Sequence, residues 1–186
     1  RPFCVLNSLF MQLLNVIEGH FLNRFINHFS VVIINSHVNS TLANQLALYV
    51  TMYSPLQMAG DFPENFDRYP DAFQFIRNVP VDWDETHILE AEPGDYLTIA
   101  RKTKGKRTWF LGAITDENAR KTTLKLDFLA PFTTYKAVIY EDAKEAHWEN
   151  NPKAYTIRTI EVTSKSKLNL NLAPGGGTAI SFFPVD

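Results

Sequence analysis

The chain has 186 residues, of which 45% are hydrophobic and 20% charged, with a formal net charge of -2. These values are ordinary for a soluble globular protein, and the length suits one core, or one small domain and part of another. The net charge argues against general binding to nucleic acid or anionic membranes, and a single cysteine excludes an internal disulfide framework and a cysteine-rich zinc site.

Residues 1–35 differ in character from the rest, because they are rich in phenylalanine and their only charged residues are Arg1, Glu18 and Arg24. They predict either a buried helix over about 9–29 with a short strand after it, or a segment that is not native to the fold. Glu18 and Arg24 make the apolar run a poor membrane span, and it lacks the pattern of a signal peptide. The missing initial methionine indicates a chain that is incomplete or processed at its N-terminus.

An amphipathic helix is predicted next, with Ser40 or Thr41 as its N-cap and Asn44 and Gln45 on its polar side. It is expected to end at Ser54-Pro55, because a residue that precedes proline disfavours the helical conformation.

Residues 55–60 (PLQMAG) then predict a short buried parallel strand. Residues just past the carboxyl end of a barrel strand face the active site, so Gln57, Asp61 and Glu64 are the candidates for contact with a substrate. The alternative is that Asp61 caps the following turn and that Glu64 is solvated. Neither interpretation assigns a catalytic role to these residues.

A second helix is predicted over residues 71–78, with a proline at its start. Phe73 and Ile76 are expected to form its apolar stripe, flanked by Phe75. Residues 79–84 then break the helix and predict the domain junction.

From residue 83 onward the chain alternates apolar and polar residues between polar turns, with no helical pattern in between. Seven or eight strands with this spacing predict an antiparallel sandwich. The expected strands cover residues 88–91, 96–100, 109–113, 124–128, 135–140, 157–162, 168–172 and 178–183.

The fold class expected from this pattern is mainly β, an antiparallel C-terminal β-sandwich preceded by a remnant of the end of a (β/α)8 barrel. The expected divisions are a doubtful segment over 1–35, the last helix–strand–helix of a barrel over 36–80, and the sandwich over 81–186.

Few residues of the sandwich suggest chemistry. Gly175-Gly176-Gly177 predicts a turn between strands, since the lysine and helix of a phosphate-binding loop do not follow. The carboxylates of Asp82, Asp84 and Glu85 could bind a sugar or calcium beside Trp83, or form a solvated junction.

Aromatic and histidine side chains of the sandwich also have two interpretations. Trp109 and Trp148 could stack on a sugar ring, although Trp109 lies inside a predicted strand and is expected in the core. His87 and His147 stand alone in the sequence, which favours surface or packing roles over metal ligation.

Five blocks of the sequence carry a family resemblance: SPLQMAGDFPENF (54–66), PDAFQFIRNVPVDWDET (70–86), EAEPGDYLTIARK (90–102), WFLGAITDENAR (109–120) and LAPGGGTAI (172–180). In this order they resemble the C-terminal end of glycoside hydrolase family 97, which includes α-glucosidases and α-galactosidases. The resemblance covers about residues 36–182. It implies an N-terminal β-sandwich domain and a catalytic (β/α)8 barrel before the C-terminal sandwich.

The resemblance also implies what lies elsewhere. The family's catalytic carboxylates and calcium-binding glutamates come earlier, so no catalytic residue and no metal ligand is assigned to this chain. Calcium, an oligosaccharide substrate and a periplasmic or secreted location are implied for the complete enzyme. The implied partners are the rest of the barrel and the N-terminal domain.

Two functions are therefore expected. The first is an inactive fragment of an enzyme that hydrolyses α-glucosidic or α-galactosidic bonds, whose sandwich supports the barrel or subunit contacts. The second is an autonomous carbohydrate-binding module, which would show a row of exposed aromatic side chains.

Overall fold

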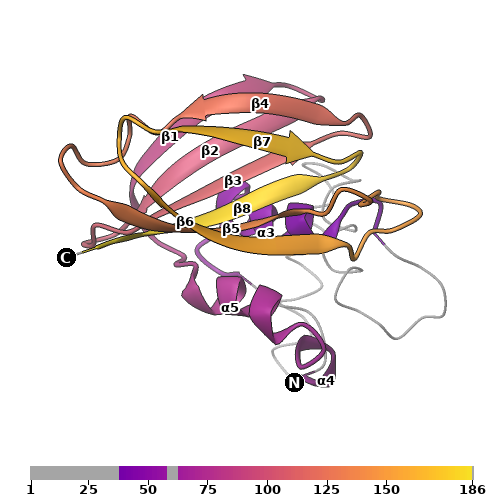
Figure 1. Cartoon of the computed structure of the whole chain (residues 1–186). Helices are drawn as coiled ribbons and strands as arrows, with labels where there is room; N and C mark the ends of the chain where they lie inside the picture. The colour runs from indigo at the N-terminus through magenta and orange to yellow at the C-terminus, as the bar shows by residue number, and fades with distance from the viewer. Residues whose placement is uncertain (1–37, 58–62, 186) are drawn as a thin grey trace. The chain divides into compact units, whose positions relative to one another are not determined.

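The computed structural model describes residues 38–57 and 63–185 (Figure 1). The predictions for residues 1–35 lie outside the described residues, as does Asp61. The chain forms two compact units, of which one comprises Asn39–Met58 and Tyr69–Asp186. The other is described only around α4 (Pro63–Phe66), a helix of four residues. No helix in the described part of the chain is long and apolar enough to cross a membrane.

Eight antiparallel strands follow one another without an intervening helix, as predicted: β1 (Trp83–Glu92), β2 (Tyr96–Thr103), β3 (Trp109–Thr115), β4 (Arg120–Lys125), β5 (Tyr135–Asp142), β6 (Tyr155–Val162), β7 (Lys167–Leu172) and β8 (Gly177–Pro184). Six form a sheet in the order β1-β2-β3-β8-β5-β6, and β4 pairs with β7 in a second sheet (Figure 1). The mainly β, antiparallel prediction is confirmed. Phe128 was expected in the fourth strand but follows its end at Lys125.

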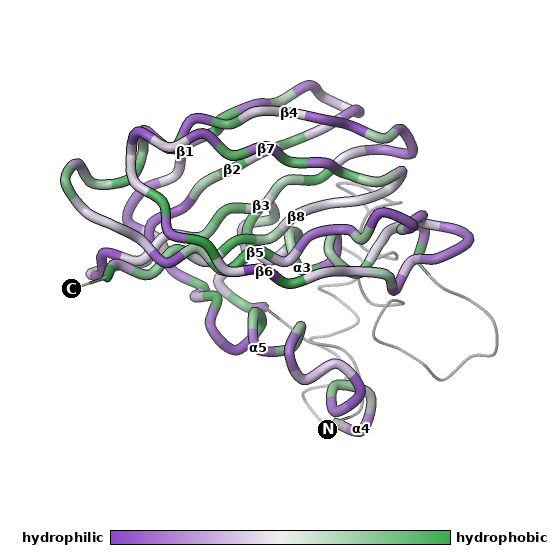
Figure 2. Tube along the Cα trace, viewed as in Figure 1, coloured by the Kyte–Doolittle hydropathy of each residue, from purple (hydrophilic) through white to green (hydrophobic). Residues whose placement is uncertain are grey.

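The core fills the space between these two sheets. On β7 the side chains of Leu168, Leu170 and Leu172 are buried, whereas Asn169 and Asn171 between them are exposed. The hydropathy alternates in the same way along the β7 trace in Figure 2. The leucines meet buried side chains of the large sheet, among them Leu111, Ile139, Ile180 and Phe182. This period-2 pattern is what one buried face of a strand requires.

The large sheet is also covered on its outer face, where the helices α3 (Leu42–Thr51) and α5 (Pro70–Asn78) pack. The first five residues of β3 are therefore all buried: Trp109 and Leu111 point into the core, whereas Phe110 contacts Phe75 of α5. Phe75 also packs edge-to-face against Tyr140 of β5. The unit thus has three layers: the small sheet, the large sheet, and the helices α3 and α5. The sandwich prediction included only the two sheets.

Helix α3 begins as predicted but is not amphipathic. Thr41 is its N-cap, and the Thr41 hydroxyl accepts a hydrogen bond from the Asn44 N–H at 3.2 Å. All ten residues of the helix are buried, including Asn44 and Gln45, which were expected on a polar side. Both amides are tolerated there because each makes a hydrogen bond, to the Gly176 carbonyl and to the Ser40 hydroxyl respectively.

The predicted buried strand over residues 55–60 is wrong for its described part, residues 55–57. The Ser54 hydroxyl accepts from the Leu56 N–H at 3.2 Å and donates to the Leu56 carbonyl at 2.7 Å, which closes a tight local turn. Leu56 is consequently 63% exposed.

Helix α5 covers the predicted residues but buries another face. Ala72 and Phe75 are its buried residues, whereas Phe73 and Ile76, the predicted stripe, are only half-buried. Phe75 is buried because its ring packs against Phe110 of β3 and Tyr140 of β5. The sequence analysis had predicted that it only flanks the buried stripe.

Candidate functional site

A buried carboxylate holds the N-terminus of α3 on the sandwich. Asp142, at the end of β5, is 9% exposed, and its Oδ1 accepts a hydrogen bond of 2.5 Å from the hydroxyl of Thr41. Its Oδ2 accepts from the backbone N–H groups of Ala173 and Gly177 at 2.9 and 2.8 Å. One side chain therefore joins the helix cap to the turn between β7 and β8.

Burial dominates the electrostatics of this carboxylate. Removal from water raises the pKa of Asp142 to about 6, although its hydrogen bonds from Thr41, Ala173 and Gly177 lower it. The positive end of the α3 dipole favours a negative charge at this place.

The glycines of the β7–β8 turn allow the helix to approach. A Cβ atom on Gly177 would lie 2.6 Å from the Asn44 Cα, and one on Gly176 would collide with the Asp142 Oδ2. Gly175 has a φ of 63°, which a residue with a side chain rarely adopts. Its carbonyl accepts from the Thr41 N–H at 3.0 Å. The predicted turn between β7 and β8 is thus also the surface on which the N-terminus of α3 packs.

The C-terminus of α3 is held by a positive charge. The Nε of Arg101, on β2, donates to the Val50 carbonyl at 2.7 Å, and its Nη1 donates to the Thr86 hydroxyl at 3.2 Å. The guanidinium lies over the rings of Tyr53 and Trp83. A cation at a helix C-terminus satisfies a free carbonyl and opposes the negative end of the dipole. We call Asp142 and Arg101 together the helix clasp.

Helix α5 has an anchor of its own. The Tyr155 hydroxyl, on β6, donates to the Asp71 Oδ1 at 2.7 Å in the first helical turn. Together with the Phe75 packing, this contact fixes the second helix on the same face of the sheet.

The residues predicted to meet a substrate are placed only in part. Gln57 is half-buried and its Nε2 donates to the Met52 carbonyl at 3.3 Å. Glu64 is exposed on α4, and Asp61 is outside the described residues. Their contact with a substrate stays a prediction.

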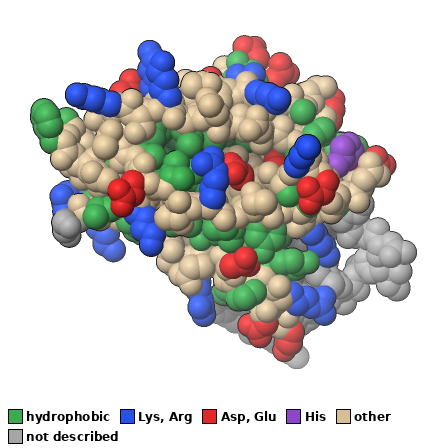
Figure 3. All heavy atoms as spheres, in the orientation of Figure 1, with side chains coloured by type: hydrophobic (Ala, Val, Ile, Leu, Met, Phe, Trp, Pro, Cys, Tyr) green, Lys and Arg blue, Asp and Glu red, His purple; other side chains and the backbone are tan. Residues whose placement is uncertain are grey.

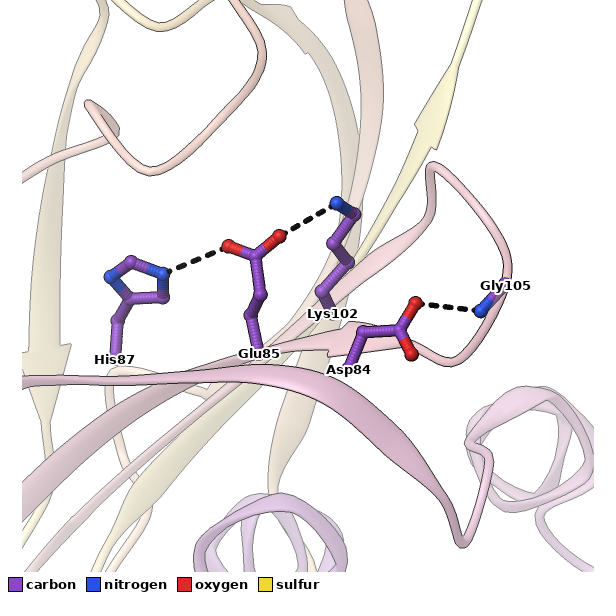
Figure 4. Close-up of polar contacts among 5 residues, drawn as sticks. All are labelled: Asp84, Glu85, His87, Lys102 and Gly105. Atoms are coloured by element: carbon purple, nitrogen blue, oxygen red, sulfur yellow. Dashed lines mark hydrogen bonds and ion pairs between the residues drawn. The ribbon is translucent and has the colours of Figure 1, made fainter.

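The acidic residues at the start of β1 are paired within the chain, and Figure 4 shows two of them, Asp84 and Glu85. Glu85 lies between Lys102 at 2.7 Å and His87 at 3.3 Å, and these contacts lower the pKa of its carboxyl. Asp84 accepts from the Gly105 N–H at 2.7 Å.

Asp82, the third member, forms an ion pair of 2.7 Å with Lys104, whose ammonium lowers the pKa of the Asp82 carboxyl. Among the residues that the structure describes, no group of three or more His, Cys, Asp or Glu side chains is placed to hold a metal. Each of the three carboxylates thus has a hydrogen-bond or ion-pair partner within the chain.

The tryptophans do not form a sugar platform. Trp109 is 3% exposed and lies in the core, as predicted, with His87 packed beside it. Trp148 is half-buried between His147, with which it stacks, and the backbone of Gly175. In the described part of the chain, only two exposed large hydrophobic residues are aromatic, Tyr53 and Phe132. The row of exposed aromatics expected of a carbohydrate-binding module is not formed by these residues.

A family model described as "Glycosyl-hydrolase 97 C-terminal, oligomerisation" matches residues 82–183. The chain belongs to glycoside hydrolase family 97. The predicted resemblance is confirmed, and the matched residues are those of the sandwich.

Relatives agree with this assignment. A retaining alpha-galactosidase from Bacteroides thetaiotaomicron is 37% identical over 140 residues, which are 75% of this chain and 20% of that protein. A family 97 enzyme from Pseudoalteromonas sp. strain K8, solved in complex with acarbose, is 47% identical, with a TM-score of 0.79 over 81% of this chain and 23% of that one. A beta-arabinopyranosidase structure is 27% identical with a TM-score of 0.65, over 78% of this chain and 22% of that one. The chain spans about a fifth, or less, of the length of the curated relatives it matches.

Sequence reasoning missed both residues of the clasp. Each is a charged residue that comes after an apolar pair in its strand: Arg101 directly follows Ile99-Ala100, and Asp142 follows Ile139-Tyr140 with Glu141 between them. A charge inside a buried run signals a buried partner. The partners are 101 and 51 residues away along the chain, so their identity could not be read from the sequence.

Proposed function

We propose that this chain is the C-terminal supporting part of an enzyme that hydrolyses α-glucosidic or α-galactosidic bonds. Its relationship to a retaining alpha-galactosidase and to an enzyme solved with acarbose supports this activity for the complete protein. No residue of this chain is proposed as catalytic, and the chain alone is expected to be inactive.

The role that we propose for the sandwich is to fix α3 and α5, which the family resemblance assigns to the end of the catalytic barrel. The observation that carries this proposal is the helix clasp, since Asp142 and Arg101 hold both ends of α3. Hydrolysis requires two carboxyl groups at a defined separation across the glycosidic bond. A barrel whose last helices are fixed to a rigid sheet keeps such a separation better than one whose end is free.

Further properties belong to the same proposal. The family description "oligomerisation" supports a second role in subunit contacts. Calcium is proposed for the complete enzyme, as the family resemblance implies. A periplasmic or secreted location and an oligosaccharide substrate are likewise proposals for the complete enzyme.

Amide hydrogen exchange on the whole chain tests the anchoring of α3. Asp142→Ala removes a buried acceptor, so amides in the first turn of α3 should exchange roughly tenfold to a hundredfold faster. Amides in the middle of β3 serve as the internal reference for global unfolding. Asp84→Ala is the matched control, because Asp84 also accepts a backbone N–H but is exposed. Equal effects of both variants on α3 would contradict the proposed anchoring.

A further inference from the structure

The two edges of the six-stranded sheet are built differently. The edge strand β1 pairs with β2 through two shifts of register, between Trp83 and Glu85 and between Ile88 and Glu90. The opposite edge strand, β6, pairs with β5 in unbroken register over all eight residues. Among the described strands, β6 pairs with β5 alone.

The difference between the β1 and β6 edges determines which of them can pair with a strand of another molecule. Bulges twist an edge away from other strands and acidic side chains repel them, so β1 is protected. A regular edge of β-branched residues is a template for another strand. The one cation inside β6, Arg158, does not guard this edge, because Glu141 of β5 pairs with it at 2.7 and 3.2 Å.

The polar backbone groups of β6 that face outward can be assigned. The Ala143 N–H donates to the Ala154 carbonyl at 3.2 Å, in the same register that pairs β5 with β6. Backbone groups alternate in direction along an antiparallel strand. Tyr155, Ile157, Thr159 and Glu161 therefore turn their N–H and C=O groups to the free edge.

The two outer faces of the sandwich are less suited to a contact between subunits than the β6 edge. The outer face of the large sheet is occupied by α3 and α5. The outer face of β4 and β7 carries the exposed residues Lys121, Lys125 and Lys167, and basic side chains stand out over this layer (Figure 3). A surface with several like charges resists burial.

We propose that β6 pairs with β6 of a second copy of this chain, antiparallel and centred on Ile157, to make one continuous sheet. This inference rests on the subunit contacts of the proposed function. The register uses the outward backbone groups of both strands and places Ile157 against its own copy. It also brings Lys153, in the turn just before β6, to the end of the shared sheet where Glu161 of the other copy lies, and both side chains are exposed in one chain.

The test is the oligomeric state of the whole chain by analytical ultracentrifugation over a range of concentrations. Lys153→Glu should raise the dimer dissociation constant roughly tenfold or more, since both symmetry-related pairs change from attraction to repulsion. Adding Glu161→Lys should restore the dimer by exchanging the charges. Lys121→Glu, which makes the same charge change on the outer face of β4, should have no effect. Thermal melting checks that each variant is folded.

Each contrary outcome has a distinct meaning. A dimer that ignores Lys153→Glu, or that the double variant does not restore, overturns the β6 register and leaves subunit contact in place. A monomer at every concentration overturns the β6 dimer itself. Neither result touches the anchoring of α3, which hydrogen exchange tests separately.

Discussion

Asp142 makes the stability of this protein depend on pH in an unusual direction. Burial raises the pKa of Asp142 to about 6 in the folded chain, whereas an unfolded aspartic acid keeps its ordinary value of 3.8. Between these two values the folded chain holds a proton that the unfolded chain releases. The free energy of unfolding therefore falls as the pH rises through this window, and it is highest below the lower value.

The size of the effect follows from the two pKa values. A difference of about two pKa units corresponds to about 3 kcal/mol, since each unit is worth about 1.4 kcal/mol. Asp142→Asn provides the comparison, because an amide is neutral at every pH. Its oxygen can accept from the Ala173 and Gly177 N–H groups, and its NH2 can donate to the Thr41 hydroxyl.

The assay is urea unfolding of the parent chain and of Asp142→Asn at several pH values. The stability of the parent chain relative to the variant should fall by about 3 kcal/mol between about pH 3 and pH 7. Contacts with lysines lower the pKa values of Asp82 and Glu85, so these carboxyls add stability that is lost as the pH falls. Both proteins carry them, and their effect cancels in the difference. If the free energies of unfolding of the parent chain and of Asp142→Asn changed with pH in parallel, the reasoning about Asp142 would be refuted.

Two further predictions concern packing and activity. Phe75→Ala should lower the free energy of unfolding by about 3–5 kcal/mol, because the Phe75 ring is fully buried against the sheet. The half-buried Phe73→Ala should cost clearly less in the same urea titration, and a larger loss at Phe73 would mean that another face of α5 is docked. The purified chain should not hydrolyse nitrophenyl α-glucosides or α-galactosides, and turnover above a blank from the same preparation would contradict the supporting role.

The features predicted correctly are those that local chemistry determines. The alternation of Leu168, Leu170 and Leu172 requires one buried strand face, whatever that face meets. Thr41 caps α3 because a hydroxyl there accepts from the Asn44 N–H. The family resemblance could also be predicted from local sequence, since it rests on long contiguous blocks.

The features missed depend on contacts between distant segments. Phe73, Phe75 and Ile76 are all apolar, and only the rings on the facing strands decide that Phe75 is the buried one. The apolar residues after Pro55 predicted a strand, but the Ser54 hydroxyl closes a turn there and Leu56 is exposed.

Helix α3 shows why the helices and the sandwich of this chain need each other. A helix of ten residues is too short to persist alone in water. It carries no acidic residue in its first turn and no basic residue in its last, so it does not compensate its own dipole. The sandwich supplies both charges, Asp142 at the N-terminus and Arg101 at the C-terminus, from strands β5 and β2. A change at either residue should therefore act on the helix first and on the sheet second, which is the order that the proposed supporting role of the sheet requires.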